Sequence, residues 1–178
     1  MSGKQKSRDK IVFDWFMKDL LGYSGPTIKP TAQQVFMKSL VDVAAADGTF
    51  SEQEREWIVG FATISGYPQE LVNELEKYEP GQCSDVKNYF QNVHLPYVKK
   101  SGLSVIYHGI RAASADGELH AKEIEAIYTL AKKLGINDEQ VQQVRAICDE
   151  ENKLRQKRAI LLFPHSFDDA LNEFYKHH

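Results

Sequence analysis

Four acidic residues recur at a fixed spacing in two stretches of the chain. The first stretch reads Ala44-Ala-Ala-Asp47-Gly48-Thr-Phe-Ser51-Glu-Gln-Glu54, and the second reads Ala113-Ser-Ala-Asp116-Gly117-Glu-Leu-His120-Ala-Lys-Glu123. In each stretch an Asp-Gly pair is followed, after five residues, by a glutamate. Carboxylate oxygens are the hard ligands that Ca²⁺, Mg²⁺ and Mn²⁺ prefer. The candidate metal ligands are therefore Asp47, Glu54, Asp116 and Glu123.

The spacing matches the second half of an EF-hand calcium loop but not its first half. With Asp47 at loop position 5, Gly48 takes the glycine position 6 and Glu54 takes the final position 12. Positions 1 and 3 would then be Val43 and Ala45, which supply no carboxylate. One copy alone cannot complete a calcium cage, so ordinary EF-hand binding is disfavoured. If the two copies met, their four carboxylates would repel one another, and a cation or basic partners would favour the charged forms.

Helix capping explains the same residues without a metal. Ser51-Glu-Gln-Glu54 is a capping box, in which the serine hydroxyl and the glutamate carboxylate bind free backbone N–H groups at a helix start. Asp-Gly is a turn former by itself, which assigns Gly48 and Gly117 to turns. His120 is a poor N-cap, and yet Glu123 is still present in the second copy. A capping role and an added metal role therefore both stay open, with the loop residue His120 as a weaker ligand candidate.

The two stretches belong to a longer internal repeat. Residues 41–72 align with residues 110–141 without gaps, at an offset of 69 residues. Identical pairs extend beyond the acidic motif to Ile58 and Ile127, and to Gly66 and Gly135. A match of this length indicates a duplicated helical hairpin, with repeats at about 31–72 and 97–141.

Apolar residues at helical spacing predict helices along the whole chain. The expected helices cover 9–22, 31–47 with Thr31 as N-cap and Gln34 reaching back, 51–65, a short one at 71–75, 84–94, 96–115, 120–134, 138–155 and a terminal one from Ser166. No stretch alternates with the period of two that strands need. We therefore expect a disordered basic tail at 1–8 and a single all-α domain at 9–178. Its duplicated hairpins pack around a pseudo-two-fold axis, with extra N- and C-terminal helices.

Composition limits the classes of function. The net charge of −3 provides no global field for binding nucleic acid. No secretory signal and no apolar run near 18 residues are present, which predicts a cytoplasmic protein. Cys83 and Cys148 fit reduced structural thiols, and the chain carries no familiar catalytic motif, so we expect no enzyme. A membrane-surface anchor formed by the basic tail and the helix 9–22 is a minor alternative, which Asp14 and Asp19 disfavour.

The repeated Ala-x-Ala-Asp-Gly-x5-Glu motif, with Leu134-Gly-Ile after an apolar helix, resembles the TerB-like family. That family includes the tellurite-resistance protein TerB and the N-terminal region of DjlA-type co-chaperones. The resemblance covers roughly residues 30–145, and the insert between the copies is longer than a minimal TerB domain would have. It implies a duplicated all-α bundle, an acidic metal-associated site and a role in stress response or at the membrane surface. By position, the acidic residues would be Asp47, Glu54, Asp116 and Glu123.

Three hypotheses follow. The leading one is a non-enzymatic TerB-like module that binds a divalent cation (Ca²⁺, Mg²⁺ or Mn²⁺) through the duplicated motif and acts through protein partners in stress or metal response. The second is a metal-free module for protein–protein interaction, co-chaperone-like or scaffold, whose acidic motifs are helix caps. The third is an enzyme with an acid/base pair among the carboxylates, which would need a cleft with a raised carboxylate pKa. Resistance to tellurite does not follow from the fold alone.

Overall fold

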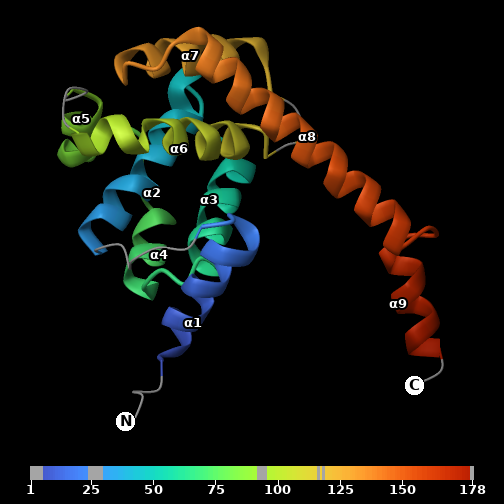
Figure 1. Cartoon of the computed structure of the whole chain (residues 1–178). Helices are drawn as coiled ribbons and strands as arrows, with labels where there is room; N and C mark the ends of the chain where they lie inside the picture. Colours follow the sequence, from blue (N-terminus) through green and yellow to red (C-terminus); the bar gives the residue numbers. More distant parts are fainter. Residues whose placement is uncertain (1–5, 24–29, 92–95, 116, 118, 177–178) are drawn as a thin grey trace.

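A computed structural model describes residues 6–23, 30–91, 96–115, 117 and 119–176. The chain is all-α, as the sequence predicts, and Figure 1 shows a helical body from which the C-terminal segment extends as an arm. The helical elements are α1 (Arg8–Trp15), the π-helical turn η1 (Phe16–Leu20), α2 (Pro30–Ala44), the 3₁₀ turn η2 (Ala45–Asp47), α3 (Glu52–Ile64), α4 (Gln69–Leu75), α5 (Ser84–Gln91), α6 (Pro96–Ala113), α7 (Ala121–Lys133), α8 (Asp138–Leu162) and α9 (Phe167–Lys176).

The centre of the body is the contact between α2 and α6, which are the first helices of the two repeats. Their inner faces supply side chains that are almost completely buried: Met37, Leu40 and Val41 from α2, and Val105, Ile106 and Ile110 from α6. Burying a side chain of this size stabilises the fold by roughly 1.5–3 kcal/mol before the entropy of ordering is counted. Apolar periodicity predicts Leu40 and Val41 of α2 and Val105, Ile106 and Ile110 of α6. It does not identify Met37, and Leu103 of α6, another apolar position of the pattern, is 38% exposed.

The duplication is visible in the backbone as well as in the sequence. The corner residues Gly48 and Gly117 have φ angles of 100° and 105°, in the left-handed region that favours glycine. Both Gly66 and Gly135, which follow the second helices of the repeats, have a φ of 71°. The two Asp-Gly motifs therefore form equivalent corners between the helices of each hairpin.

The N-terminal helix is divided in two and buries only one face. The predicted helix 9–22 is divided between α1 and η1, and Ser7 caps its start by accepting a hydrogen bond from the Lys10 amide at 3.3 Å. Phe13 and Phe16 are buried, whereas Trp15 is about half exposed, at 49%. The bundle covers only one side of this helix, where the Phe16 ring packs edge-on against another ring, 5.3 Å between centroids. Residues 1–5 of the predicted tail lie outside the described residues.

Two further helices differ from the prediction at their ends. α8 does not stop near residue 155 but continues to Leu162, because its basic residues are good helix formers and the first helix breaker is Pro164. α2 begins at Pro30, one residue before the predicted cap Thr31. The side-chain amide of Gln34 donates a hydrogen bond to Glu74 of α4 at 2.7 Å. The last three residues of the predicted helix 84–94 lie outside the described part of the chain.

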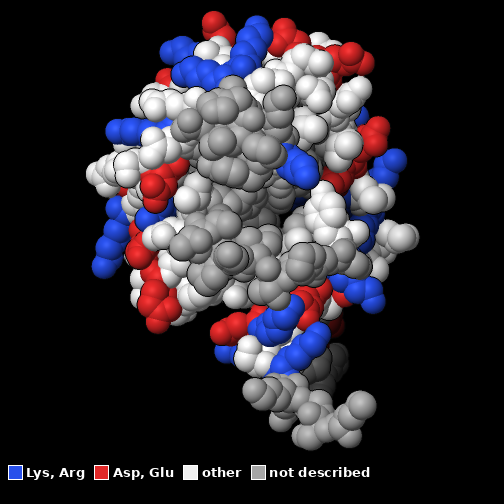
Figure 2. All heavy atoms as spheres, turned by 60° about the vertical axis from the view of Figure 1, so that its left-hand side comes forward, with Lys and Arg blue, Asp and Glu red and all other residues white. Residues whose placement is uncertain are grey.

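The surface of the body carries mixed charges. Figure 2 shows Lys and Arg side chains interspersed with Asp and Glu side chains around one face of the molecule. This distribution agrees with the small net charge of −3. Within the described residues, none of the helices combines the length and the apolar character needed to cross a membrane.

Candidate functional site

The glutamates of the two motifs, Glu54 and Glu123, cap α3 and α7 in the same way. Glu54 Oε2 accepts hydrogen bonds from the amide of Ser51 at 2.6 Å and from its hydroxyl at 2.8 Å. Glu123 Oε2 accepts the amide of His120 at 2.6 Å. Because this bond goes to the backbone, it does not depend on the side chain at the N-cap position. The presence of Glu123 behind a poor N-cap residue is therefore explained by capping.

Both capping glutamates are buried, which is rare for a carboxylate. Burial raises the pKa of Glu54; the hydrogen bonds from Ser51 oppose that effect, and the negative charges of Glu123 and Asp47 add to it. The 3₁₀ turn that contains Asp47 packs against α7, the helix that Glu123 caps. The fold thus brings three acidic residues from two copies of the motif into one electrostatic environment.

Asp47 has a local role in the corner. Its Oδ1 accepts hydrogen bonds from the amide of Thr49 at 2.9 Å and from the Thr49 hydroxyl at 2.8 Å. The residue also lines an open groove between α2 and α7, whose other charged lining residues include Asp42, Lys122 and Lys133. The equivalent residue of the second copy, Asp116, lies outside the described residues.

The chemistry of the donors fits a hard cation, because Asp47, Glu54 and Glu123 offer only carboxylate oxygens. The geometry of the described residues does not complete a cage. In that part of the chain, no three His, Cys, Asp or Glu side chains form a group that could hold a metal ion. One oxygen of each glutamate already serves as a helix cap. The structure therefore places Glu54 within the electrostatic influence of Glu123 and Asp47, without a metal cage among the described residues.

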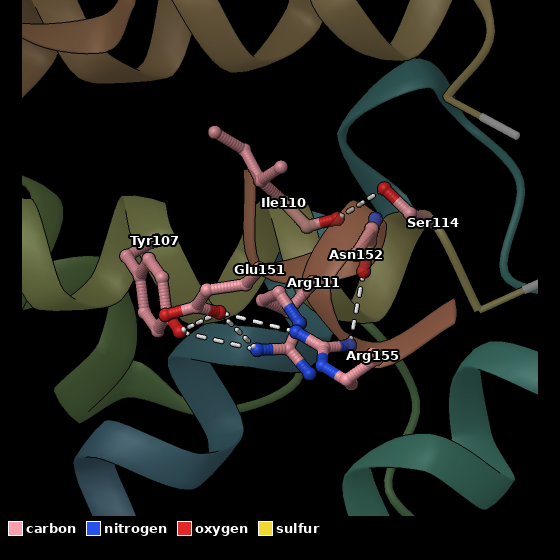
Figure 3. A network of polar contacts seen from close by, with 7 residues as sticks. All are labelled: Tyr107, Ile110, Arg111, Ser114, Glu151, Asn152 and Arg155. Carbon is pink, nitrogen blue, oxygen red and sulfur yellow. Dashed lines mark hydrogen bonds and ion pairs between the residues drawn. The ribbon is translucent and has the colours of Figure 1, made fainter. Parts of the chain in front are cut away.

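A second polar cluster, which the sequence did not reveal, joins α6 to α8 (Figure 3). Glu151 Oε2 accepts hydrogen bonds from the Tyr107 hydroxyl at 2.7 Å, from Arg111 at 2.9 Å and from Arg155 at 3.1 Å. Burial and the bond to Glu151 raise the pKa of Tyr107 to about 12. Arg155, which belongs to the basic run at 153–158, is half-buried and also donates to Asn152 at 2.9 Å. Only the tertiary fold brings these partners together, since they lie 40 or more residues apart in sequence between α6 and α8.

Next to this cluster, a cleft of about 700 Å³ lies between η1, α3, α6 and α8. His108 is one of its lining residues and is 5% exposed. Its Nδ1 donates to the Ser104 carbonyl at 2.8 Å, which leaves Nε2 as the acceptor nitrogen, buried and with no hydrogen-bond partner among the described residues. Burial lowers the pKa of His108 to about 4. This histidine is therefore neutral at physiological pH, and nothing in the sequence separated it from the other histidines.

The two cysteines carry no sign of nucleophilic chemistry. Cys83 and Cys148 are both free thiols in the structure. Burial raises the pKa of Cys148 to about 11, which disfavours the reactive thiolate. These observations fit a structural role for the buried thiol.

Two comparisons identify the family. A family model described as tellurite resistance protein TerB matches residues 40–146, which include both acidic motifs. The crystal structure of a tellurite resistance protein from Nostoc punctiforme PCC 73102 is similar to this chain, with a TM-score of 0.78 and 30% sequence identity over 91% of this chain and 98% of that chain. No curated protein sequence matches this chain. The helical fold, the duplicated Asp-Gly-x5-Glu corners and both matches agree, and the chain belongs to the TerB family.

Proposed function

We propose that this TerB-family chain binds a divalent cation, Ca²⁺, Mg²⁺ or Mn²⁺, through the duplicated acidic motif and acts through a protein partner. The observation that supports the proposal is the shared environment of Glu54, Glu123 and Asp47. The negative charges of Glu123 and Asp47 raise the free energy of the charged state of the buried Glu54 carboxylate. A bound cation supplies the positive charge that offsets this repulsion.

The residues that would hold the cation come from both copies of the motif. Glu54 and Glu123 would contribute oxygens from the starts of α3 and α7, where capping already fixes their side chains. Asp47 would contribute from the first corner, and Asp116 by its equivalent position in the sequence. Rigid placement of ligands by capping bonds reduces the ordering cost of binding.

Calorimetric titration with each of the three cations tests this proposal. The wild type should release or absorb heat with at least one cation, and the double variants Asp47→Ala/Asp116→Ala and Glu54→Gln/Glu123→Gln should not. Glutamine keeps the capping bonds, so the second variant removes charge while preserving the helix starts. Glu56→Gln, an exposed change on α3, is the matched control and should titrate like the wild type. Absence of heat in the wild type, or equal heat in all proteins, would refute cation binding.

A metal-free interaction module is the second candidate, and a specific observation favours it. One oxygen of each glutamate is used in capping, and the described residues contain no group that could hold a metal ion. If capping is the whole role, Glu54→Gln/Glu123→Gln should bind its partner as the wild type does, with or without a chelator. Loss of partner binding in this folded variant, or on addition of the chelator, would exclude the metal-free module.

The third candidate, acid/base catalysis, has weaker support. Burial raises the pKa of Asp42 as well as that of Glu54, and Asp42 lines the groove beside Asp47. However, Asp42 Oδ1 accepts the Tyr78 hydroxyl at 3.1 Å and the Gly81 amide at 3.0 Å, bonds that fix the α4–α5 connection. We therefore assign Asp42 a structural role.

Because the similar Nostoc protein is named a tellurite resistance protein, we also propose that this chain protects cells against tellurite. Expression of the wild-type chain should raise the tellurite concentration that a sensitive host tolerates. The Glu54→Gln/Glu123→Gln variant, expressed at the same level, should give less protection if the acidic cluster is the functional site. Equal growth with the wild type and with an empty vector would contradict a role in tellurite resistance.

A further inference from the structure

The C-terminal arm, residues 153–176, carries an apolar surface that nothing in the described chain covers. Figure 1 shows the end of α8 and the whole of α9 extending away from the helical body. The large apolar side chains of the arm that are more than half exposed are Leu154, Ile160, Leu161, Leu162, Phe167, Phe174 and Tyr175. Soluble proteins rarely leave so many neighbouring apolar side chains in water, and such a surface marks an interaction site.

The charges of the arm are arranged symmetrically about its middle residue, Phe163. Four cationic residues lie five to ten positions before it: Lys153, Arg155, Lys157 and Arg158. Three anionic residues lie five to ten positions after it: Asp168, Asp169 and Glu173. Of the cations, Arg155 is held by Glu151 and Asn152, and Lys153, Lys157 and Arg158 are exposed. The arm therefore has a basic half and an acidic half on either side of an apolar centre.

Such a pattern is self-complementary when two arms lie antiparallel. With the two Phe163 side chains at the centre, Arg158 of one copy faces Asp168 of the other, and Lys157 faces Asp169. Glu173 is paired within its own arm with Lys176, at 2.7 Å. The opposite charges lie the same number of residues before and after Phe163, so each basic half lies beside the acidic half of the other copy. The exposed apolar residues of both copies then meet along the shared centre. A parallel arrangement would instead place like charges together.

From this arrangement we infer that the arm is a dimerisation element, covered by the arm of a second copy of the same chain. The interface is isologous, because each arm supplies both the basic and the acidic half. This inference is independent of cation binding, since the acidic corners lie in the body and not in the arm. It also explains why α8 continues past the body instead of ending at Arg155.

The turn between α8 and α9 explains why the second arm comes from another molecule. The rings of Phe163 and Phe167 pack edge-on across this turn, with centroids 4.8 Å apart. Ser166, at a φ of 89°, caps α9 by accepting the Asp169 amide at 3.1 Å. Beyond this turn α9 continues away from the body and is not folded back along α8 (Figure 1). The complementary surface must then be supplied in trans.

Sedimentation equilibrium of the full chain tests the inference. The wild type should be a dimer, and Leu161→Glu, which places a charge at the exposed apolar centre, should be monomeric with an unchanged circular dichroism spectrum. Arg158→Glu and Asp168→Lys should each raise the dimer dissociation constant by about tenfold or more. The double variant Arg158→Glu/Asp168→Lys should return the dissociation constant towards that of the wild type, because the two opposite charges have exchanged places. Lys77→Glu, an exposed charge reversal on the body, is the control and should leave the dimer intact.

Cross-linking distinguishes the antiparallel dimer from a folded-back arm. Phe163→Cys lies on the proposed two-fold axis and should form a disulfide-linked dimer under mild oxidation. In the Arg158→Cys/Asp168→Cys variant, the cross-link should likewise join two chains. A monomeric wild type, a cross-link within one chain, or charge reversals without effect would overturn the inference. A monomer that sediments with anionic lipid vesicles would assign the apolar surface to a membrane instead.

Discussion

Gly109 of α6 lies directly against Val43 of α2 at the centre of the helical body. A Cβ atom added at Gly109 would overlap the Val43 side chain. Both residues belong to the first helices of the two repeats, so this contact joins the two hairpins. The missing side chain at position 109 sets how closely α2 and α6 approach, and the closeness of the two hairpins in turn brings the acidic corners together.

Gly109→Ala should therefore destabilise the protein, although alanine favours helices. Overpacking a core typically costs about 1–3 kcal/mol, which exceeds the gain in helix propensity of about 1 kcal/mol. Urea unfolding measures the difference. Gly60→Ala is the matched control, because Gly60 is exposed on α3 and a Cβ there meets no other atom within 4 Å. The free energy of unfolding of Gly60→Ala should rise slightly. A comparable loss of stability in Gly60→Ala and Gly109→Ala would contradict the packing argument.

Glu54→Gln should stabilise the protein at neutral pH. The pKa of Glu54 is raised in the folded state by burial, and further by Glu123 and Asp47, so its charged form costs free energy there. As the pH falls from the pKa of Glu54 in the folded state towards its pKa in the unfolded state, the Glu54 carboxylate of the wild type becomes protonated. The wild type then recovers the free energy of unfolding that the buried charge had cost. The advantage of Glu54→Gln should then disappear. Chemical unfolding at several pH values between 7 and 4 measures this trend.

The capping role of Glu54 is tested separately by Glu54→Ala. Alanine removes the acceptor of the Ser51 amide and hydroxyl, and the loss of a helix cap costs about 1 kcal/mol. The alanine variant should therefore be less stable than the glutamine variant at every pH. Equal stability of the two would show that the hydrogen bonds of the capping box contribute nothing.

His108 should make the protein less stable in mild acid. Its pKa is about 4 in the folded state, against 6.5 for an exposed histidine, so the unfolded chain binds the proton first as the pH falls. Stability is complete above the unfolded pKa and is lost between the two values. Linkage gives a loss of about 2 kcal/mol between pH 7 and pH 5 from this residue.

Substitution of His108 by phenylalanine should remove that part of the pH dependence. Phenylalanine keeps an aromatic ring against Phe36 and Phe61, whose centroids lie 5.6 and 4.9 Å from the His108 ring. The slope of unfolding free energy against pH is the measurement, because the lost bond to Ser104 also changes absolute stability. His165→Gln, in the exposed α8–α9 turn, should keep the wild-type slope. An unchanged slope in His108→Phe would exclude the buried histidine as its source.

Glu151→Ala should weaken the attachment of α8 to α6. The change leaves Tyr107 and Arg111 without their shared acceptor, and an unsatisfied, largely buried donor costs about 1–3 kcal/mol. Glu151→Gln should cost less, since the amide oxygen still accepts a hydrogen bond. Thermal unfolding measures both, with the exposed neighbour Glu150→Ala as the control. If Glu150→Ala and Glu151→Ala melt alike, the cluster does not stabilise the fold.

Local signals in the sequence predicted the features that depend on a few neighbouring residues. The Ser51–Glu54 capping box forms because its bonds close within four residues, and the glycine corners form because Asp-Gly favours a left-handed turn. Helical periodicity predicted most of the buried positions of α2 and α6, because residues three and four apart share one face of a helix. It failed for α1, where the apolar residues surround the helix and packing alone decides that Phe13 and Phe16 are inside.

The sequence by itself determined an all-α, duplicated TerB-type chain with two equivalent acidic corners, because capping, turn chemistry and periodicity are short-range. The tertiary structure placed Glu54 in the electrostatic environment of Glu123 and Asp47, because η2 packs against α7 although the two copies lie 69 residues apart in sequence. It also decided the burial of His108, the shared acceptor Glu151 and the exposure of the C-terminal arm. These features depend on how side chains of given volumes pack between distant segments, as at Gly109, where the absence of a side chain lets α2 and α6 approach. No local sequence pattern predicts them.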